Sequence, residues 1–220
     1  MHATEGIGVD GGSTLNTIAS MPVIYEDAEI LVIDKPSGLL SQPGRGPQLL
    51  DSVLTRIRSA RPWAELVHRL DRDTSGLLLV GLTATSHRLM SLAFADRRVE
   101  KHYIGLCRGL IRGQFGTIVC PLARIGTQPP QYADHPEGRI AVTQWQCLLH
   151  EANASRLRLI PITGRSHQLR AHLQAIGHPL LGDPIYGTLD GDRLKLHAES
   201  LAFAHPLSGR WLDLHAPSPF

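Results

Sequence analysis

The stretch HRLDRDTSGLLLV, residues 68–80, combines a dense group of charges with an apolar run typical of a core strand. Charged side chains are rarely buried unless they are paired. A loop directly before a buried strand can hold a carboxylate such as Asp71 on a rigid scaffold and leave it accessible. Alternatively, the charges form a solvated cluster, and Thr74, Ser75 and Gly76 form a plain turn. The loop alone does not decide between these interpretations.

The composition is that of an ordinary folded, soluble chain. Its 220 residues are 42% hydrophobic and 19% charged, which suits one domain with a sizeable core. We expect a flexible tail at residues 1–20 and a single domain at 21–220. The net charge is only +2, so local arginines must supply any attraction to an anionic partner. Three cysteines without metal-ligand spacing, no bilayer-length apolar run and no secretion signal predict a cytoplasmic protein.

Periodicity and turn chemistry predict strand pairs with interspersed helices, and therefore an α+β fold. Residues 108–139 are rich in glycine and proline and give no clear pattern. One helix is expected over Leu50, Val53, Leu54 and Ile57; a second begins after a Thr83 cap, and a third is lined by Leu169, Leu173 and Ile176 and ends at Gly177. Strands are expected at 29–34, 77–82, 103–106, 140–149, 156–160, 197–204 and 211–215.

A second dense stretch, PITGRSHQLRAH at residues 161–172, opens the third of these helices. Arg165 and His167 fall at its N-terminal end, where free N–H groups and the helix dipole favour anions. The alternative is a plain helix entry with surface arginines.

Together, the two stretches resemble the RluA family of pseudouridine synthases. The resemblance continues in KPSGLLSQPG (35–44), KHY (101–103), GHPLLGDPIYG (177–187), LHAESLAFAHP (196–206) and HAP (215–217). It implies the pseudouridine synthase fold, a mixed, mostly antiparallel sheet flanked by helices with a central active-site cleft. Within the family, the chain is most similar to the short members that modify both large-subunit ribosomal RNA and transfer RNA. Those members lack a separate N-terminal RNA-binding module.

The resemblance also implies roles for three catalytic residues. Asp71 matches the catalytic aspartate, which either attacks the anomeric carbon of the sugar or removes a sugar proton. Arg165 is expected to pair with Asp71 and to keep it ionised. Tyr103 is expected to stack on the target base and to take part in proton movement at carbon 5; its alternative role is cross-strand packing.

Three further residues are expected to bind the substrate. Arg69 fills the space left by a flipped uridine or holds the distorted backbone. Leu169 forms an apolar wall of the pocket, although core packing would equally explain a leucine there. His68 completes this group. The expected partner is an RNA stem-loop, because RNA sequence is read mostly in loops. The isomerisation adds and removes no atom, so we expect no metal or other cofactor, and we expect a monomer.

Two rival functions remain open from the sequence. The first is a metal-dependent hydrolase, suggested by twelve histidines and by the pair His167 and His172. Their separation of five residues is unsuitable, because two ligands on one helix face lie three or four apart. The second is an RNA-binding module without catalysis.

Overall fold

The computed structural model describes residues 17–18, 20–187 and 192–220. Most of the tail expected at residues 1–20 therefore lies outside the described residues. Thr17–Ile18, within that segment, forms strand β1 and pairs with β2 (Met21–Glu26).

One mixed sheet organises the described chain. Its strands follow the order β1-β2-β3-β5-β11-β6-β10-β9-β7-β8, while β4 (Glu65–Leu66) pairs with β5 and β12 with β11. Only the β5–β11 pairing is parallel among the described strands. The expected α+β class with a mostly antiparallel sheet is confirmed. The remaining strands are β3 (Ile30–Lys35), β5 (Ser75–Gly81), β6 (Glu100–Arg108), β7 (Phe115–Thr127), β8 (Pro130–Asp134), β9 (Arg139–Glu151), β10 (Ala154–Pro161), β11 (Leu196–Ala204) and β12 (Trp211–His215).

The N-terminal half of the sheet is covered on both faces, which explains its continuous apolar strands. Along β3, Leu31 and Ile33 belong to one hydrophobic cluster, whereas Ile30 and Val32 belong to another. The first cluster includes residues of α1 (Val53–Arg58), and the second includes residues of α2 (Ala84–Ala95). Because successive side chains of a strand point to opposite faces, residues 30–33 of β3 and 77–80 of β5 are apolar at every position. A short 3₁₀ helix, η1 (Pro47–Leu49), precedes α1.

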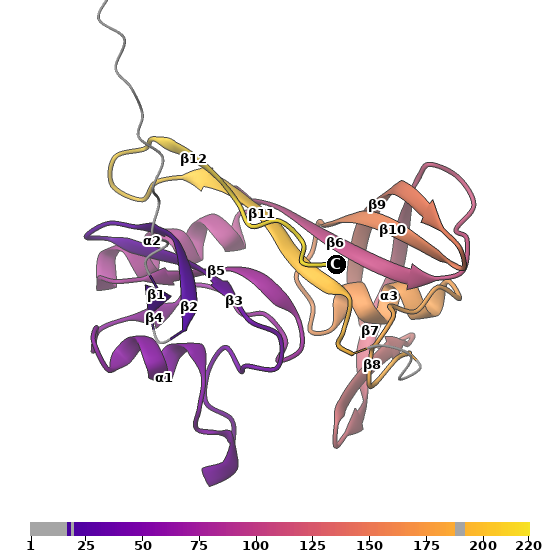
Figure 1. Cartoon of the computed structure of the whole chain (residues 1–220), viewed down its shortest axis with the longest axis horizontal. Coiled ribbons are helices and arrows are strands. Elements are labelled where there is room, and N and C mark those ends of the chain that lie inside the picture. Colours follow the sequence, from indigo (N-terminus) through magenta and orange to yellow (C-terminus); the bar gives the residue numbers. More distant parts are fainter. Residues whose placement is uncertain (1–16, 19, 188–191) are drawn as a thin grey trace, which may run out of the picture.

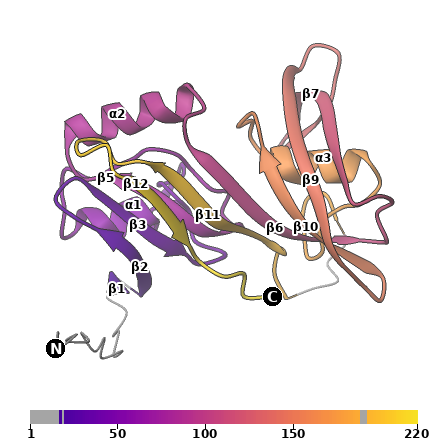
Figure 2. The same ribbon diagram turned by 90° about the horizontal axis from the view of Figure 1, so that it is seen from above.

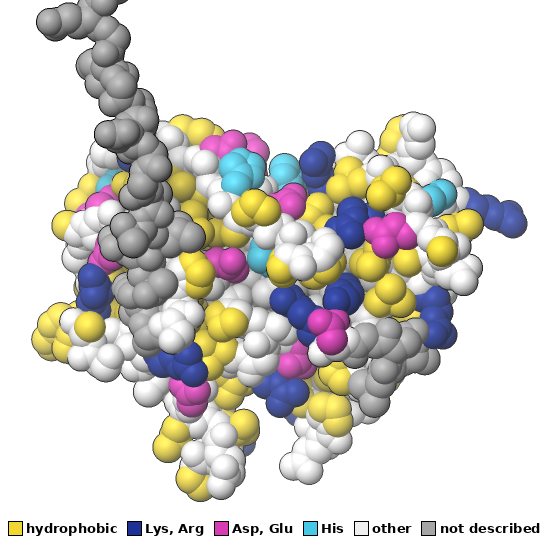
Figure 3. Space-filling model, in the orientation of Figure 1, with side chains coloured by type: hydrophobic (Ala, Val, Ile, Leu, Met, Phe, Trp, Pro, Cys, Tyr) yellow, Lys and Arg dark blue, Asp and Glu magenta, His cyan; other side chains and the backbone are white. Residues whose placement is uncertain are grey.

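The C-terminal half packs a single helix on its strands. Leu169 and Leu173 of α3 (Gln168–Ala175) join Leu157, Leu159 and Trp145 of β10 and β9 in a third cluster. Figures 1 and 2 show the two halves side by side, with the long strands β6 and β11 running between them. The segment before η1 and the β7–β8 hairpin project in the same direction, and a notch separates them in Figure 3.

The structure corrects three local expectations. Leu50 lies before the N-cap residue Ser52 and is 55% exposed, so it is not part of α1. Ile176 is the C-cap of α3 and is 38% exposed rather than buried on the helix face. The segment 108–139, which gave no clear pattern, contains β7 and β8. Ile118, Cys120 and Leu122 of β7 are buried at alternate positions, but apolar residues between them hide the period of a strand.

Other expectations are confirmed. Thr83 caps α2, and its side chain accepts a hydrogen bond from the Ser86 backbone N–H. Gly177 follows α3 with φ of 82°, a conformation that favours glycine. The expected strand pair around residues 151–154 is β9 and β10, and the closing hairpin is β11 and β12. Among the described helices, none is long and apolar enough to cross a membrane.

Candidate active site

A cavity of about 860 Å³ lies between the two halves of the sheet. Residues of the loop before β5, the end of α2, β6 and the segment leading into α3 line it. The structure brings together at this cavity all six residues expected at the site: His68, Arg69, Asp71, Tyr103, Arg165 and Leu169. The central cleft expected from the sequence is therefore present in the structure.

The loop carrying Asp71 is fixed by hydrogen bonds from the segment 35–41. The Ser41 hydroxyl donates to the Leu70 carbonyl at 2.7 Å and accepts from the Leu70 N–H at 3.1 Å. The Arg72 carbonyl accepts from the Gly38 N–H at 2.9 Å and from the buried ammonium of Lys35 at 2.9 Å. These bonds hold the backbone on both sides of Asp71, so the carboxylate is presented from a rigid loop.

Gly76 allows β11 to come close behind this loop. It has φ of 110°, and a Cβ there would lie 2.3 Å from the Ala198 carbonyl oxygen. Glycine alone accommodates both the positive φ and the contact. The turn expected at Thr74-Ser75-Gly76 is instead formed by residues 71–74 and is closed by a hydrogen bond from the Thr74 N–H to the Asp71 carbonyl at 3.2 Å. Ser75 and Gly76 begin β5 and pair with β11.

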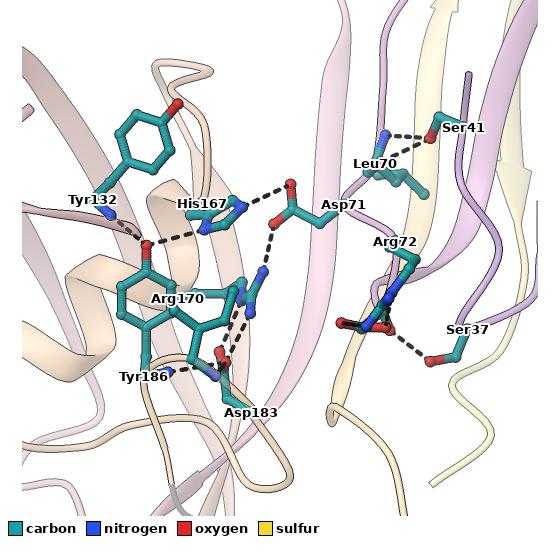
Figure 4. Close-up of polar contacts among 12 residues, drawn as sticks. Ser37, Ser41, Leu70, Asp71, Arg72, Tyr132, His167, Arg170, Asp183 and Tyr186 are labelled. Carbon is teal, nitrogen blue, oxygen red and sulfur yellow. Dashed lines mark hydrogen bonds and ion pairs between the residues drawn. The ribbon is translucent and has the colours of Figure 1, made fainter. Parts of the chain in front are cut away.

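The Asp71 carboxylate meets a guanidinium from the other side of the cavity, as Figure 4 shows. Arg170 Nη1 donates to Asp71 Oδ2 at 3.1 Å. The other two nitrogens of Arg170, Nε and Nη2, each donate to Asp183 at 2.8 Å. Arg170 thus links the loop of one half to the segment 182–187 of the other.

Asp183 determines the direction of the Arg170 fork. Its side chain is fully buried, and its Oδ1 also accepts the backbone N–H groups of Ile185 at 2.9 Å and Tyr186 at 3.1 Å. Burial opposes ionisation, but the hydrogen bonds and charge of Arg170 outweigh it and lower the pKa of Asp183. Burial likewise opposes the charge of Arg170, yet Asp183 and Asp71 raise the pKa of that guanidinium. Both groups remain charged at neutral pH.

The expected pairing of Arg165 with Asp71 is wrong. Arg165 lines the cavity, but its Nε donates to the Ile140 carbonyl at 3.2 Å. It lies in the loop before α3, whereas Arg170 lies inside the helix and is 2% exposed. The guanidinium that contacts Asp71 therefore comes from the buried face of α3. A catalytic role of Arg165 through another contact stays a prediction.

Tyr103 projects from β6 and packs against the clusters of both halves. Burial raises its pKa, and the nearby negative charge of Asp71 raises it further. The phenol is therefore protonated at neutral pH and can donate a hydrogen bond into the cavity. Its ring is an aromatic surface at the base of the cleft, as stacking on a nucleobase requires.

The remaining three expected residues differ in their surroundings. Arg69 is exposed, which suits contact with a phosphate. Leu169 is 6% exposed and both lines the cavity and packs in the core, so its two expected roles coexist. His68 stacks on Phe94 with ring centroids 4.6 Å apart, and its Nε2 accepts the Leu79 N–H at 3.0 Å. Burial lowers the pKa of His68 to about 3, so its ring is neutral.

From the sequence, Arg170 was only a substitute partner of Asp71 should Arg165 fail, and Asp183 and Tyr186 had no expected role. His167 was placed at the helix N-terminus and was considered, and disfavoured, as a metal ligand. One signal was available for Arg170. It lies next to Leu169 and three residues before Leu173 on a helix, and an arginine so close to a buried face needs a partner. Nothing in the sequence identified Asp183 as that partner. His167 bonds to the Tyr186 hydroxyl, whereas His172 bonds to Thr143, and no set of three ligand-type side chains converges within the described ranges.

Comparisons with known proteins support the expectation drawn from the motifs. A family model described as RNA pseudouridylate synthase matches residues 29–175. The chain is 43% identical over 206 residues to the dual-specificity RNA pseudouridine synthase RluA of Yersinia pestis, covering 91% of this chain and 100% of the relative. It is 41% identical over 204 residues to the protein of the same name from Escherichia coli strain K12, covering 90% and 93% respectively.

Solved structures show the same fold. The human protein RNA pseudouridylate synthase domain containing 1 superposes with a TM-score of 0.77 and 28% identity, over 96% of this chain and 87% of that one. A second human protein, RNA pseudouridylate synthase domain containing 4, shares the fold with a TM-score of 0.73 and 23% identity. The chain belongs to the RNA pseudouridylate synthase family, as the motifs at residues 68–76 and 162–172 predicted.

Proposed function

We propose that this pseudouridine synthase modifies uridines of both large-subunit ribosomal RNA and transfer RNA, with Asp71 as its catalytic carboxylate. The dual specificity is supported by relatives named dual-specificity RNA pseudouridine synthases, which cover nearly the whole chain at about 40% identity, and the two RNA classes are those that the sequence resemblance implies. The observation that carries the role of Asp71 is its position. Its carboxylate faces the cavity and pairs with a guanidinium that is itself fixed by Asp183.

The reaction balances without a co-reactant. The bond between N1 of uracil and C1′ of the ribose breaks, the base turns, and a bond forms between C5 and C1′. The hydrogen leaves C5 and N1 gains one, so no atom is added overall. Asp71 attacks C1′ as a nucleophile, or it removes a proton from the sugar; both routes need an ionised carboxylate.

Arg170 and Tyr103 act on either side of this carboxylate. Arg170 donates a charge-assisted hydrogen bond to one oxygen of Asp71 and so holds the carboxylate in place. Tyr103 provides the aromatic face on which the extruded uracil stacks. Because the phenol is protonated, it donates a hydrogen bond at first, and it can take the C5 proton only if its own proton passes to the uracil, whose N1 gains one overall.

RNA reaches the cavity by base flipping, because a stacked or paired uridine cannot contact Asp71. Arg69 and Arg97 are exposed at the cavity and are placed to bind the phosphates around the flipped nucleotide. We further propose that the enzyme acts in the cytoplasm, as a monomer, on stem-loops whose bases can splay out.

Release of the C5 hydrogen tests this function directly. Purified enzyme is incubated with uridine-labelled stem-loops from large-subunit ribosomal RNA and from transfer RNA of its own organism, and Asp71→Asn serves as the matched control. We expect release from both RNAs by the parent and from neither by the variant. Release from one RNA only would reject dual specificity, and release by the variant would reject the role of Asp71.

The same assay separates the two rival functions. A metal-dependent hydrolase would lose activity after exhaustive chelation and would release no C5 hydrogen. A non-catalytic RNA-binding module would bind the stem-loops and leave every uridine unchanged. We expect hydrogen release to continue at the parent rate after chelation.

A further inference from the structure

A second side chain faces Asp71, on the oxygen that Arg170 leaves open. His167 Nε2 lies 3.8 Å from Asp71 Oδ1, while Arg170 contacts Oδ2. Both side chains point at the carboxylate in Figure 4. The distance exceeds that of a hydrogen bond, as is common for catalytic contacts that tighten only when substrate binds. His167 is therefore placed to act on the oxygen that is least restrained in the free enzyme.

The left-handed backbone of His167 is a sign that this placement is imposed. Its φ of 53° is uncommon for residues other than glycine, although histidine, like asparagine and aspartate, adopts it more often than most. Gln168 fixes the loop before it: its amide oxygen accepts from the Thr163 hydroxyl at 2.7 Å and the Arg165 N–H at 3.0 Å. The amide nitrogen of Gln168 donates to the Val142 carbonyl at 2.9 Å. Backbone strain of this kind persists only where surrounding contacts over-determine it, and it is common at active sites.

The Tyr186 hydroxyl determines which nitrogen of His167 carries the proton. It accepts the Tyr132 backbone N–H at 2.8 Å and lies 3.0 Å from His167 Nδ1. Burial raises the pKa of Tyr186 to about 12, so its hydroxyl keeps its proton at neutral pH. Nδ1 of His167 is the acceptor within reach of that proton. Burial also lowers the pKa of His167, so the imidazole is neutral, and its remaining proton must sit on Nε2, facing Asp71.

The opposite tautomer is disfavoured by electrostatics. A proton on Nδ1 would leave the lone pair of Nε2 facing the negative charge of Asp71 Oδ1. The ring of Tyr186 packs against both side chains that face Asp71. Its centroid lies 5.7 Å from that of the His167 ring, in an edge-on arrangement, and 5.2 Å from the guanidinium carbon of Arg170. One tyrosine thus orders the two side chains that flank the carboxylate.

We propose that His167 is a positioning residue of this reaction, which holds Asp71 Oδ1 in line with the sugar through its Nε2–H, and that Tyr186 fixes the tautomer needed. This proposal rests on the proposed function, because Asp71 must be the reacting group. It adds a second donor to the Arg170 contact, so that each carboxylate oxygen has its own partner.

The tautomer is tested without any catalysis. ¹⁵N NMR of the histidine rings at neutral pH, with the His167 signals assigned through His167→Asn, reports which nitrogen is protonated. We expect a neutral ring with the proton on Nε2 in the parent, and a mixture of tautomers in Tyr186→Phe. A parent ring protonated on Nδ1, or on both nitrogens, would overturn the proposal whatever the enzyme's substrate.

Two variants of His167 test the contact with Asp71. Asparagine tolerates the left-handed backbone and places its amide near Nδ1, too short to reach Asp71. Glutamine places its amide N–H near Nε2 and keeps the donor. We expect His167→Asn to lower the single-turnover rate about tenfold, the effect of losing a hydrogen bond to a charged group, and His167→Gln to recover most of that loss. RNA binding and thermal stability are measured in parallel.

The pH profile distinguishes this role from a purely structural one. The titratable or charged groups that face His167 or Asp71 are Lys35, Arg69, Tyr103, Tyr132, Arg170, Asp183 and Tyr186. All of them are retained in the His167 variants. Loss of the Nε2 donor makes the charged form of Asp71 less favourable, so the acid limb of the rate profile moves to higher pH in His167→Asn but not in His167→Gln.

Equal rates and unshifted acid limbs for the Asn and Gln variants would overturn the proposal and leave His167 a structural residue. Failure of the parent to release C5 hydrogen would instead reject the proposed function. That failure leaves the NMR result intact, so the two ideas fail separately.

Discussion

The two walls of the cavity hold their functional groups by different means. The loop wall, residues 68–75, is fixed mainly by hydrogen bonds to its backbone, from Ser41, Gly38 and Lys35. The helix wall, residues 163–170 with the supporting segment 182–187 behind it, is fixed by side chains, chiefly the Arg170–Asp183 ion pair and the Gln168 amide. The residue proposed as nucleophile or base thus comes from a wall ordered through its backbone, and its electrostatic partner comes from a wall ordered through its side chains.

This difference has consequences for function and for stability. Because the loop is held through its backbone, the Asp71 side chain is not needed to hold the loop in place, and its carboxylate is available to the substrate. A buried ion pair directs a guanidinium accurately, but it makes the helix wall sensitive to the loss of either partner. The loop wall should therefore tolerate single substitutions that the helix wall does not.

The largest effect is expected for Asp71, the residue of the loop wall that we propose as the reacting carboxylate. Asp71→Asn keeps the shape of the side chain but removes its ability to act as a nucleophile or base. We expect a loss of turnover on the order of 10⁴-fold or more. Single-turnover hydrogen release measures it, and RNA affinity should change little because Asp71 lies inside the cavity rather than at its rim. A rate within tenfold of the parent would contradict the assignment.

The helix wall should lose stability most when Asp183 changes. In Asp183→Asn, the amide N–H₂ group would face the donors of a guanidinium that is 2% exposed. Removing one partner of a buried pair costs about 3 to 5 kcal/mol, which urea unfolding at neutral pH would measure.

The pH dependence of that loss provides its control. Because the folded-state pKa of Asp183 is lowered, its contribution to stability is fully present above the unfolded value of about 3.9. The contribution is lost as the pH falls through the folded-state pKa. The difference in unfolding free energy between parent and variant should thus be constant from pH 5 to 8 and shrink below pH 4. A difference that persists unchanged in acid would show that charge is not its source.

A smaller effect is expected when Arg170 keeps its charge but loses its fork. In Arg170→Lys, a single ammonium group cannot form the two parallel hydrogen bonds to Asp183 and the third to Asp71 that the guanidinium forms. We expect a loss of about 1.5 to 3 kcal/mol of interaction, roughly ten- to a hundredfold in rate. Arg165→Lys is the matched comparison from the same segment, and its loss should be clearly smaller. A larger loss for Arg165→Lys would restore the pairing expected from the sequence.

The sequence predicted the loop wall well because its determinants are contiguous. Asp71, the turn and the buried strand stand within one short motif, so local rules predict a turn followed by a strand. The turn spans residues 71–74, however, and the strand already begins at Ser75. The same holds for Thr83, because an N-cap residue stands directly before the helix that it caps. The partner of Asp71 was missed because Arg165 and Arg170 lie five residues apart in one motif. Which of them faces the carboxylate depends on where α3 begins, and helix boundaries are the least certain part of such predictions.

The rest of the helix wall required the fold itself. Asp183 and Tyr186 are far from α3 in sequence, and only the packing of residues 182–187 against it brings them to Arg170 and His167. The hairpin of β7 and β8 was unreadable for a related reason. In β7 the burial does alternate, with Ile118, Cys120 and Leu122 buried. The positions between them carry Val119, Pro121 and Ala123, so the sequence lacks the apolar-polar alternation that marks a half-buried strand.

The smallest effect is expected where the loop wall loses a neutral contact. Ser41→Ala removes the hydroxyl that both donates to and accepts from the Leu70 backbone, and Ser41 is only 4% exposed. The variant leaves buried backbone groups of Leu70 unpaired. We expect the free energy of unfolding, measured in urea, to fall by about 1 to 2 kcal/mol, less than for Asp183→Asn. Because the contact contains no titratable atom, this loss should stay the same from pH 3 to 8, in contrast to that of the helix wall. The rate of hydrogen release should fall less than tenfold, since the bonds from Gly38 and Lys35 still hold the Arg72 carbonyl beyond Asp71. A loss of activity as large as that of Arg170→Lys would mean that the loop wall depends on this single hydroxyl, and the contrast between the two walls would then disappear.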